Sequence, residues 1–577
     1  MGRSFPPLLL PYSPTLWPKT YNPPSAMTLD VIPSWSEIAA AKVAARDALI
    51  PEQWRIPVTD ALNVIDIPKT CGVLSPGEIG ITETPAPTLV QKILREELRS
   101  YDVTLAFCKR AAIAQQLTNC LTEIIFEEAL NAAAGIDAEY SKSKTPLGPL
   151  HGLPVSLKDN FYIEGVDTTV GFVAWANDPA KKQQESEMTQ IMRECGAVLF
   201  CKTNVPTAMM IAETYNNVWG YTCNPYNRNC SSGGSSGGES ALLAMKGSPL
   251  GVGTDIGGSI RIPGSMCGLY SLKPSFGRFP TYGARSGLPG QEAIRSINGP
   301  MSTALESVAM WAKTVVDNKP WNRDPNMIPI PWRDVEVPEK LCFGLIMDNG
   351  IVKPTPPVTR ALLETKAALE KAGHKVIEWT PYNAEEATAL GARFFTGDGG
   401  AKIAQILACS GEPYPEGLAG YRKRFDAIKE NPPLVAALWE MQSDRVSYCK
   451  RNLQHWLASK DVTGTGRPFD GLISPVSMHS ACPKMAFNDH VTYTLMWNIM
   501  DYSATTFPVS FVDSQLDKKP AYEPRNETEK KIWDRYDSTE VVGAPVSLQL
   551  VCQRLEEEKA LKLTEVIAKA LVEAGAK

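Results

Sequence analysis

The sequence predicts an α/β protein with a mixed, mainly parallel β-sheet and helices on both of its faces. Between about residues 150 and 316, short apolar runs such as 197–201 and 250–253 alternate with helical segments, which is typical of such sheets. A second unit of strand, helix and strand begins near residue 341. The chain has 577 residues, of which 44% are hydrophobic, so it can bury a large core in two to four domains.

The N-terminal part is expected to be an arm followed by helices. Residues 1–33 contain eight prolines and predict an extended or disordered arm. Ser34-x-x-Glu37 is a capping box that opens a helix, and Thr88-x-x-Gln91 predicts the start of another. Helical periodicity continues, with breaks, to about residue 142. We expect these helices to cover an edge of the core or to form the contact of a homodimer.

The C-terminal part is expected to extend the sheet and to cover the site. Residues 318–337 are rich in proline and tryptophan and predict a surface crossover. A helical region at about 386–460 is expected to cap the site. The remaining elements expected here are strands at 341–347, 375–379, 471–475 and 545–551, and helices at 357–373 and 555–574.

Two glycine-rich runs, 233–239 and 251–261, carry the serines Ser235 and Ser259. Glycine lets the backbone take a positive φ or approach a ligand closely. Ser259 follows several backbone N–H groups that can point at one position, as an oxyanion hole requires. A flexible linker is the alternative reading, but apolar residues flank both runs, and linkers lack such flanks.

Lys158 lies in a predicted strand within 148–160, among apolar residues. A lone strand lysine is usually exposed. If this one is buried, desolvation lowers its pKa, and a neutral amine becomes available as a base near neutral pH. A lysine that acts on one serine through a second serine forms a proton relay without histidine.

The histidines support this interpretation. There are five, and none belongs to a metal-binding pattern such as HExxH. The letters Gly233-x-Ser235-x-Gly237 match a nucleophile elbow, but the preceding run is too polar for its strand. A Ser-His-Asp triad stays open, because its members can be distant in sequence. For His151 we favour a local hydrogen bond in a turn over a catalytic role.

Bulk properties exclude several classes of protein. The net charge of −5 gives no basic footprint for nucleic acid, and no apolar run approaches the ~20 residues that span a bilayer. The odd number of cysteines, 13, fits reduced thiols and a cytoplasmic location. A phosphate- or nucleotide-binding protein is the competing class, but the glycine spacing matches neither a dinucleotide fingerprint nor a P-loop.

These motifs resemble those of the amidase signature hydrolases, and within that family the fungal acetamidases. The resemblance covers roughly residues 34–575. It is carried by Gly-Gly-Ser-Ser-Gly-Gly-Glu at 233–239, Gly-Val-Gly-Thr-Asp-Ile-Gly-Gly-Ser-Ile-Arg at 251–261, Pro-Val-Ser-Leu-Lys-Asp at 154–159 and Gly-Ala-Pro-Val-Ser-Leu-Gln-Leu-Val at 543–551. It implies one large α/β domain, 34–577, with a central twisted mixed sheet flanked by helices. Its parts would be N-terminal helices at 34–142, a signature core at about 150–316 and a C-terminal part at about 338–577.

The resemblance also implies roles for single residues. Ser259 would be the nucleophile, Ser235, following a cis peptide, would relay the proton, and Lys158 would be the base. No metal or organic cofactor is implied. The oxyanion hole would be formed by the backbone N–H groups of Ile256, Gly257, Gly258 and Ser259. Asp255 and Arg261 would be a charge pair that supports this loop, and the backbone of Met209 would line the substrate site.

The substrate is less closely defined. Likeness to acetamidases implies short acyl amides that release ammonia, and small carbamates are similar enough in shape to be substrates. Larger aryl or indole amides remain an alternative. A glutamyl-tRNA amidotransferase subunit is another family option, but the chain has no obvious docking or tRNA-binding feature. Candidate walls of the substrate pocket are Met209, Met210, Trp175, Trp219, Tyr221 and the segment 493–501.

Overall fold

An 11-stranded sheet runs through the computed structural model, which describes residues 33–179, 182–431, 433–487 and 490–575. Its strand order is β1-β3-β2-β8-β10-β9-β14-β15-β13-β11-β12. The strands are β1 (Leu121–Ile124), β2 (Pro154–Lys158), β3 (Val198–Thr203), β8 (Gly251–Asp255), β9 (Tyr270–Lys273), β10 (Ile297–Ser302), β11 (Cys342–Leu345), β12 (Lys375–Glu378), β13 (Gly471–Pro475), β14 (Ala504–Phe511) and β15 (Pro545–Val551).

Strand direction differs from the prediction. β2 is parallel to β3 and β8, and β11 is parallel to β12 and β13. The strands between these two groups pair antiparallel, from β8 through β10, β9 and β14 to β15 and β13. The sheet is therefore mixed, as predicted, but the prediction of a mainly parallel sheet is wrong. Apolar runs report burial on both faces of a strand, and burial does not encode the direction of its neighbours.

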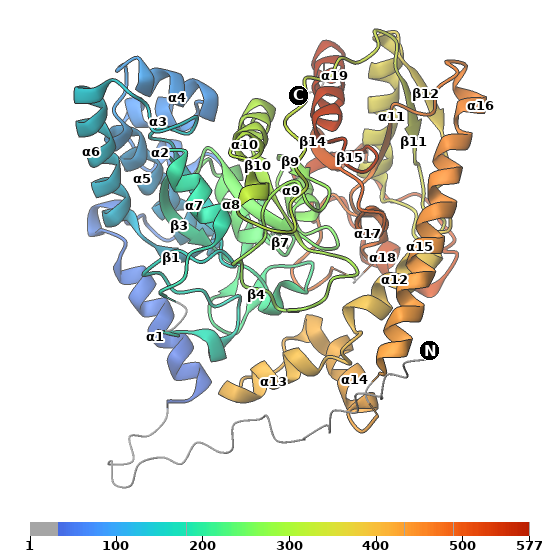
Figure 1. The fold of residues 1–577 in the computed structure, drawn as a ribbon, viewed down its shortest axis with the longest axis horizontal. Helices are drawn as coiled ribbons and strands as arrows, with labels where there is room; N and C mark the ends of the chain where they lie inside the picture. Colours follow the sequence, from blue (N-terminus) through green and yellow to red (C-terminus); the bar gives the residue numbers. More distant parts are fainter. Residues whose placement is uncertain (1–32, 180–181, 432, 488–489, 576–577) are drawn as a thin grey trace, which may run out of the picture.

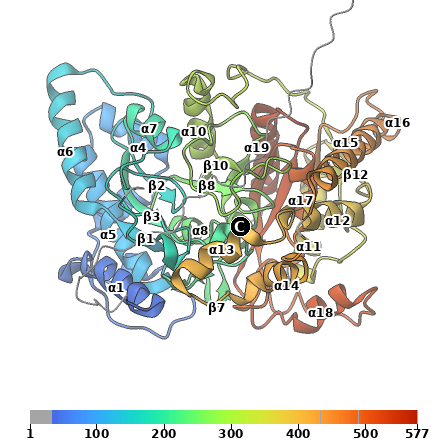
Figure 2. The same ribbon diagram turned by 60° about the horizontal axis from the view of Figure 1, so that its bottom comes forward.

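Helices cover both faces of the sheet, as predicted (Figures 1 and 2). Phe343 and Leu345 of β11 pack in one cluster with α11 and α19, whereas Cys342 on the same strand packs with α12, α15 and α17. Alternate residues of a strand point to opposite faces, so these helices lie on opposite sides. The C-terminal helices are α10 (Leu305–Asp317), α11 (Pro356–Lys371), α12 (Ala384–Phe395), α13 (Ala401–Ser410), α14 (Ala419–Ile428), α15 (Val435–Ala458), α16 (Lys460–Thr463), α17 (Thr492–Ile499), α18 (Glu527–Arg535) and α19 (Glu557–Glu573).

The N-terminal helices flank one end of the sheet (Figure 1). The capping box of Ser34 and Glu37 is confirmed at the start of α1 (Trp35–Ala48). The second predicted box is wrong, because α4 (Ala86–Leu94) already begins after Pro85, so Thr88 lies inside the helix. Proline favours the first helical turn, and this local preference outweighs the motif. The other helices here are α2 (Ile67–Thr70), α3 (Pro76–Thr82), α5 (Ser100–Thr118), α6 (Phe126–Ser143) and α7 (Glu187–Glu194). The proline-rich arm lies outside the described residues, apart from Pro33.

Short elements complete the chain. Two-stranded sheets form from β4 (Tyr215–Asn216) with β5 (Gly220–Tyr221) and from β6 (Cys223–Asn224) with β7 (Asn227–Ser231). The short 3₁₀ helices are η1 (Glu52–Trp54), η2 (Val173–Trp175), η3 (Thr207–Met209), η4 (Pro320–Asn322) and η5 (Glu416–Leu418). Among the described helices, none combines the length and the apolar character needed to cross a bilayer.

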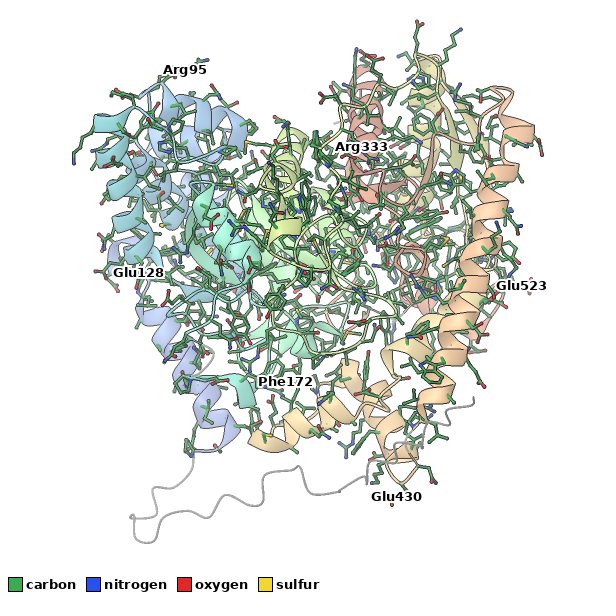
Figure 3. All side chains as sticks on the ribbon, viewed as in Figure 1. Arg95, Glu128, Phe172, Arg333, Glu430 and Glu523 are labelled. Atoms are coloured by element: carbon green, nitrogen blue, oxygen red, sulfur yellow. The ribbon has the colours of Figure 1, made fainter. Side chains whose placement is uncertain are left out.

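The predicted cap is a set of separate helices rather than one helical run. α13 and α14 lie apart from the sheet in Figure 1, and side chains occupy the space beside α13 in Figure 3. Phe172 lies above α13 in Figure 3 and belongs to one apolar cluster with Ile403 and Leu407 of that helix. The buried carboxylate of Glu412 accepts the N–H of Val173 at 2.8 Å. The cap is therefore anchored by apolar packing and by a buried hydrogen bond.

Candidate active site

The first glycine run forms a tight connection between β7 and α8 (Gly237–Ala244). The Gly234–Ser235 peptide bond is cis, and Ser235 is 1% exposed. Gly233 has a φ of +78°, and a Cβ there would lie 2.7 Å from the Cα of Pro263. Only glycine fits such a position without strain. The run therefore holds Ser235 in a buried turn against the start of α9 (Arg261–Met266).

Lys158 ends β2 with its side chain fully buried. Its Nζ lies 2.8 Å from Ser235 Oγ, 2.7 Å from Thr254 Oγ1 and 3.4 Å from the Thr254 carbonyl oxygen. When the amine is neutral, its two N–H groups can donate to the Thr254 oxygens while its lone pair faces the Ser235 hydroxyl. This geometry is the one that a base acting on Ser235 requires.

Burial is the main influence on the charge of Lys158. It lowers the pKa of the amine from its ordinary value to about 7, although the carboxylates of Asp255 and Glu239 act in the opposite direction. At neutral pH a substantial share of Lys158 is therefore uncharged and able to accept a proton.

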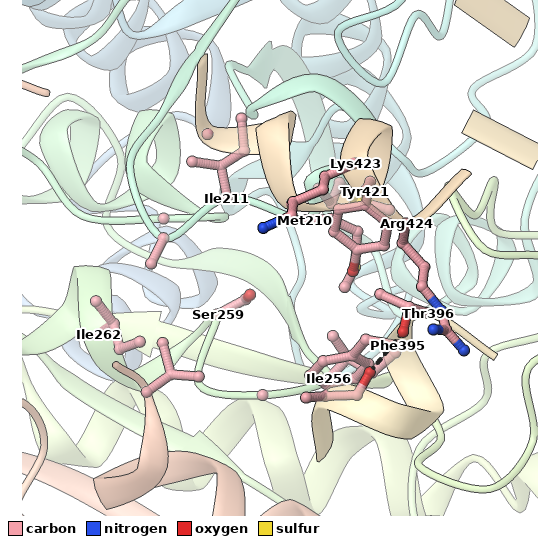
Figure 4. A pocket seen from close by; sticks show the side chains of 18 of the residues that line it. Met210, Ile211, Ile256, Ser259, Ile262, Phe395, Thr396, Tyr421, Lys423 and Arg424 are labelled. Carbon is pink, nitrogen blue, oxygen red and sulfur yellow. Dashed lines mark hydrogen bonds between the residues drawn. The ribbon is translucent and has the colours of Figure 1, made fainter. Parts of the chain in front are cut away.

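Ser259 lies in the loop between β8 and α9, and its hydroxyl points into a cavity (Figure 4). The N–H of Ser236 donates to the Ser259 carbonyl oxygen at 3.1 Å, which fixes the two glycine runs to each other. In the described part of the chain, no hydrogen bond joins the Ser235 and Ser259 hydroxyls. Ser259 is half-buried and is the most accessible member of the set, whereas Ser235 and Lys158 are fully buried.

The backbone around Ser259 provides donors for an oxyanion. The N–H groups of Ile256, Gly257 and Ser259 have no acceptor among the described residues. The N–H of Gly258 instead donates to Asp255 Oδ1 at 2.8 Å. Three of the four predicted donors are therefore unoccupied, and the fourth is bound to the supporting carboxylate.

Asp255 and Arg261 form the predicted charge pair, and both are fully buried. Arg261 Nε lies 3.1 Å from Asp255 Oδ2 and its Nη2 lies 3.1 Å from Oδ1. Burial alone would raise the pKa of the Asp255 carboxyl, but the Arg261 guanidinium and the Asn498 amide hold it well below its usual range. The pair is charged at neutral pH and braces the loop that carries Ser259.

Helix α17 supports this pair from a distant part of the sequence. Arg261 Nη1 donates to the Thr494 carbonyl at 3.1 Å, and Asn498 Nδ2 donates to Asp255 Oδ1 at 2.8 Å. The Thr494 hydroxyl donates to the Gly257 carbonyl at 2.6 Å. Gly258, with a φ of +137°, leaves space for that threonine. The sequence analysis missed these roles of Thr494 and Asn498, although polar residues in so apolar a segment are a signal for them.

The cavity beside Ser259 has a volume of about 570 Å³. It is bounded by η3 and the residues after it, by the Ser259 loop, by the end of α12 and by α14 (Figure 4). Its walls are mainly apolar, and they include Met209, Met210, Ile211, Ala212, Ile256, Ile262, Phe395, Tyr421, Ala427 and Val491. Met209 and Met210 thus lie where the sequence analysis expected pocket walls, and the helices of the cap line the site as predicted.

The other predicted walls do not line this cavity. Trp175 stacks on Arg285, whose Cζ lies 3.8 Å from the ring centroid. Trp219 is buried, and its Nε1 donates to Thr169 Oγ1 at 3.0 Å. Tyr221 donates to the Glu213 carboxylate, and the segment 493–501 contributes the support described above. These expectations were wrong because Trp219 is buried in the core, and because Trp175 and Tyr221 contact Arg285 and Glu213 instead.

A buried carboxylate that the sequence analysis passed over lies behind the site. Glu239 accepts hydrogen bonds from Ser156 and, at 2.7 Å, from Thr203 Oγ1. Burial raises its pKa to about 7. Ser156 lies on β2 with Lys158, and Thr203 ends the neighbouring strand β3. Glu239 therefore ties α8 to the two strands that position the lysine.

His151 forms the local turn contact that the sequence analysis favoured. Its Nδ1 accepts the N–H of Leu147 at 3.1 Å. Among the described residues, no group of His, Cys, Asp or Glu side chains has the arrangement of a metal site. All 13 cysteines are free.

The first prediction concerns pH. Since only neutral Lys158 can accept a proton, kcat/KM for an uncharged amide should rise with pH and level off above the lysine pKa of about 7.

Thr254→Val should lower kcat about 10²-fold, because it removes an oxygen that orients the amine. Thr254→Ser, which keeps that oxygen, should restore most of the rate. Steady-state kinetics of ammonia release between about pH 5 and pH 9 measures both effects. A flat profile for the native enzyme would contradict the role of the lysine.

The second prediction concerns the buried charge pair. Asp255→Asn leaves Arg261 buried without its counter-charge and should lower the free energy of unfolding by about 3–5 kcal/mol. The double variant Asp255→Asn/Arg261→Met should recover part of that stability without recovering activity, because the loop keeps no charged brace. Urea unfolding at constant pH measures the differences. A loss below about 1 kcal/mol in the single variant would show that the pair behaves like an exposed one.

The chain is similar to several known proteins along most of its length. The family described as Amidase matches residues 102–561. An acetamidase of Emericella nidulans is 39% identical over 554 residues, covering 93% of this chain and 98% of the relative. An acetamidase of Aspergillus oryzae is 38% identical, with 93% and 99% covered. The solved structure of a fatty acid amide hydrolase is similar at a TM-score of 0.85 and 31% identity, covering 93% of this chain and 94% of that one.

Proposed function

The chain belongs to the amidase signature family of amide-hydrolysing enzymes, and we propose that it cleaves short carboxylic amides through an acyl-enzyme on Ser259. The observation that carries this proposal is the contact of 2.8 Å between the buried amine of Lys158 and the hydroxyl of Ser235. Lys158 is buried, has a lowered pKa and contacts Ser235, which lies behind the accessible Ser259. It can therefore act as a base on Ser259, with Ser235 as the relay.

In the first step, the Ser259 oxygen attacks the amide carbon. Its proton passes to Ser235 while the Ser235 proton passes to the lone pair of Lys158. The carbonyl π bond becomes an oxyanion, which the N–H groups of the Ser259 loop stabilise. One such donor contributes about 10²–10³-fold in rate.

The intermediate then collapses and breaks the carbon–nitrogen bond. The leaving nitrogen takes a proton from Ser235, which regains one from the Lys158 ammonium, so ammonia or an amine departs as a neutral molecule. Water then attacks the resulting ester and passes a proton through Ser235 to Lys158. Ser259 departs and regains a proton from Lys158 through Ser235, and the acid is released. Residues of this chain supply every proton transfer, and the scheme calls for no cofactor.

The relatives support the choice of substrate. Two of them are acetamidases, which favours short acyl amides. Small carbamates would pass through a tetrahedral intermediate like that of the amides, so they are a second substrate class within this proposal. The cavity volume of about 570 Å³ favours a third class, the larger aryl or indole amides, because it lies in the range of ~300–1,000 Å³ that holds drug-sized ligands.

The cellular setting belongs to the same proposal. The 13 free cysteines favour a reducing compartment such as the cytoplasm. A homodimer remains a prediction from the N-terminal helices. A nucleotide-binding function gains no support, because the glycine runs enclose Ser235 and support Ser259 rather than framing a phosphate site.

The third prediction tests the nucleophile. Ser259→Ala should lower amide turnover by several orders of magnitude and abolish stoichiometric labelling by a fluorophosphonate. Ser240→Ala is a matched control, since that buried hydroxyl donates to the Ser232 carbonyl at 3.0 Å and stands apart from the relay. Intact-protein mass spectrometry measures the labelling. Site-localised labelling of Ser259→Ala would assign the attack to another residue.

The fourth prediction separates chemistry from substrate fit. Ser235→Ala should lower hydrolysis of acetamide and of ethyl carbamate together, because both need the same relay. Met210→Ala should change their ratio, because that side chain lines the cavity and one methylene shifts discrimination about 10–200-fold. Parallel kinetics on the two substrates provides the ratio. If Ser235→Ala spares one substrate, the two reactions use different chemistry.

A further inference from the structure

One wall of the cavity beside Ser259 is a face of helix α14. The residues of this helix that line the cavity are Gly420, Tyr421, Lys423, Arg424 and Ala427. Their spacing of three, four and seven positions is that of one helical face. Gly420 and Ala427 are small, and the two charged residues between them, Lys423 and Arg424, line the cavity and point to opposite sides of Tyr421 (Figure 4).

Lys423 and Arg424 are the charged residues of the cavity wall, and no aspartate or glutamate of the described chain lines it with them. Neither cation forms an ion pair with a described residue. Their neighbours do, because Arg422 and Lys429 both lie beside Asp426, at 3.8 Å and 3.6 Å. Asp426, the acidic residue of this helix, is therefore paired with other cations. Two positive charges face the cavity without a counter-charge in a chain whose net charge is −5.

The remaining walls of the cavity are apolar. Its apolar lining includes Met210, Ile211, Ile262, Phe395 and Val491. Acetamide, with one methyl group on its acyl carbon, would leave most of the 570 Å³ empty. A ligand that fills this space has an apolar body, a reactive amide at Ser259 and a group at the far end that suits two cations.

We propose that the preferred substrates are amides whose apolar acyl or aryl group ends in a carboxylate, that is, monoamides of dicarboxylic acids. The carboxylate would face Lys423 and Arg424 while the amide carbon faces Ser259. Arginine can bind a carboxylate through two parallel hydrogen bonds, and lysine adds a point charge. The inference rests on the proposed amidase function, and it assigns this class, rather than amides the size of acetamide, as the preferred substrates.

Both cations are exposed to solvent, so the effect of each is moderate. An exposed ion pair contributes a few-fold in affinity, and two acting on one carboxylate contribute about tenfold together. The contribution should decrease with salt, since the screening length is about 10 Å at 0.1 M ionic strength.

The experiment compares pairs of substrates that differ only in charge. Adipamic and suberamic acids each carry one amide and one carboxylate, and adipamide and suberamide replace that carboxylate with a second, neutral amide. Ammonia release at low ionic strength provides kcat/KM for each, halved for the diamides because they have two reactive ends. We expect the native enzyme to favour the amic acids about tenfold.

The variants locate the source of that preference. Lys423→Met/Arg424→Gln should bring the ratio of amic acid to diamide close to one. Arg422→Gln is the matched control, since that arginine lies on the same helix but outside the cavity wall, and it should keep the native ratio. Added salt should lower the native ratio and leave the double variant unaffected.

Equal kcat/KM for the paired substrates in the native enzyme would overturn the inference, as would a preference that survives the double variant or high salt. If neutral amides are hydrolysed without any preference for a carboxylate, the proposed amidase function stands and this inference fails. If no amide is hydrolysed, the proposed function fails. The cationic wall is then tested by calorimetric binding of adipate, which the double variant should weaken about tenfold, and equal binding by both proteins would refute it.

Discussion

The burial of one amine is the constraint on which the rest of the site depends. Lys158 is a useful base only while water is kept from it, because desolvation is what lowers its pKa. The chain achieves this by placing it at the end of an interior strand, with Ser235 and Thr254 as its contacts. Glu239 behind β2 is buried as well, and the burial that lowers the pKa of the lysine raises that of the acid. A site of this kind tolerates little loosening, since solvation of the lysine favours its charged form.

The second requirement is a rigid loop around Ser259, and its support comes from the far end of the chain. Asp255 and Arg261 neutralise each other in the interior, while Asn498 of α17 and Gln549 of β15 complete their hydrogen bonds. The Ser259 loop is thus supported by residues more than 200 positions away in sequence. The first half of the chain therefore contains Ser259 and its charge pair but lacks the α17 and β15 residues that complete the hydrogen bonds of that pair.

The sequence predicted some of these features and not others, for physical reasons. Strand positions such as Gly471–Pro475 followed from apolar runs, whereas strand direction did not, because burial on both faces looks alike in either direction. The contact between Lys158 and Ser235 was expected from a family resemblance and could not follow from spacing, since 77 positions separate the two residues. The pocket walls were mostly missed: α14 has a charged sequence that looks like a solvated helix, and only its position over the cavity gives Lys423 and Arg424 a role.

The central claim, a neutral lysine at physiological pH, can be measured directly by titrating the protein labelled with ¹³C at the lysine ε-carbons. The Lys158 signal is assigned as the resonance that disappears in Lys158→Met, which separates it from the buried Lys273, whose pKa burial lowers to about 8. The account predicts a chemical-shift transition for Lys158 near a pKa of about 7. A transition near the ordinary lysine value of about 10.4 would mean that the amine is charged at neutral pH and cannot be the base.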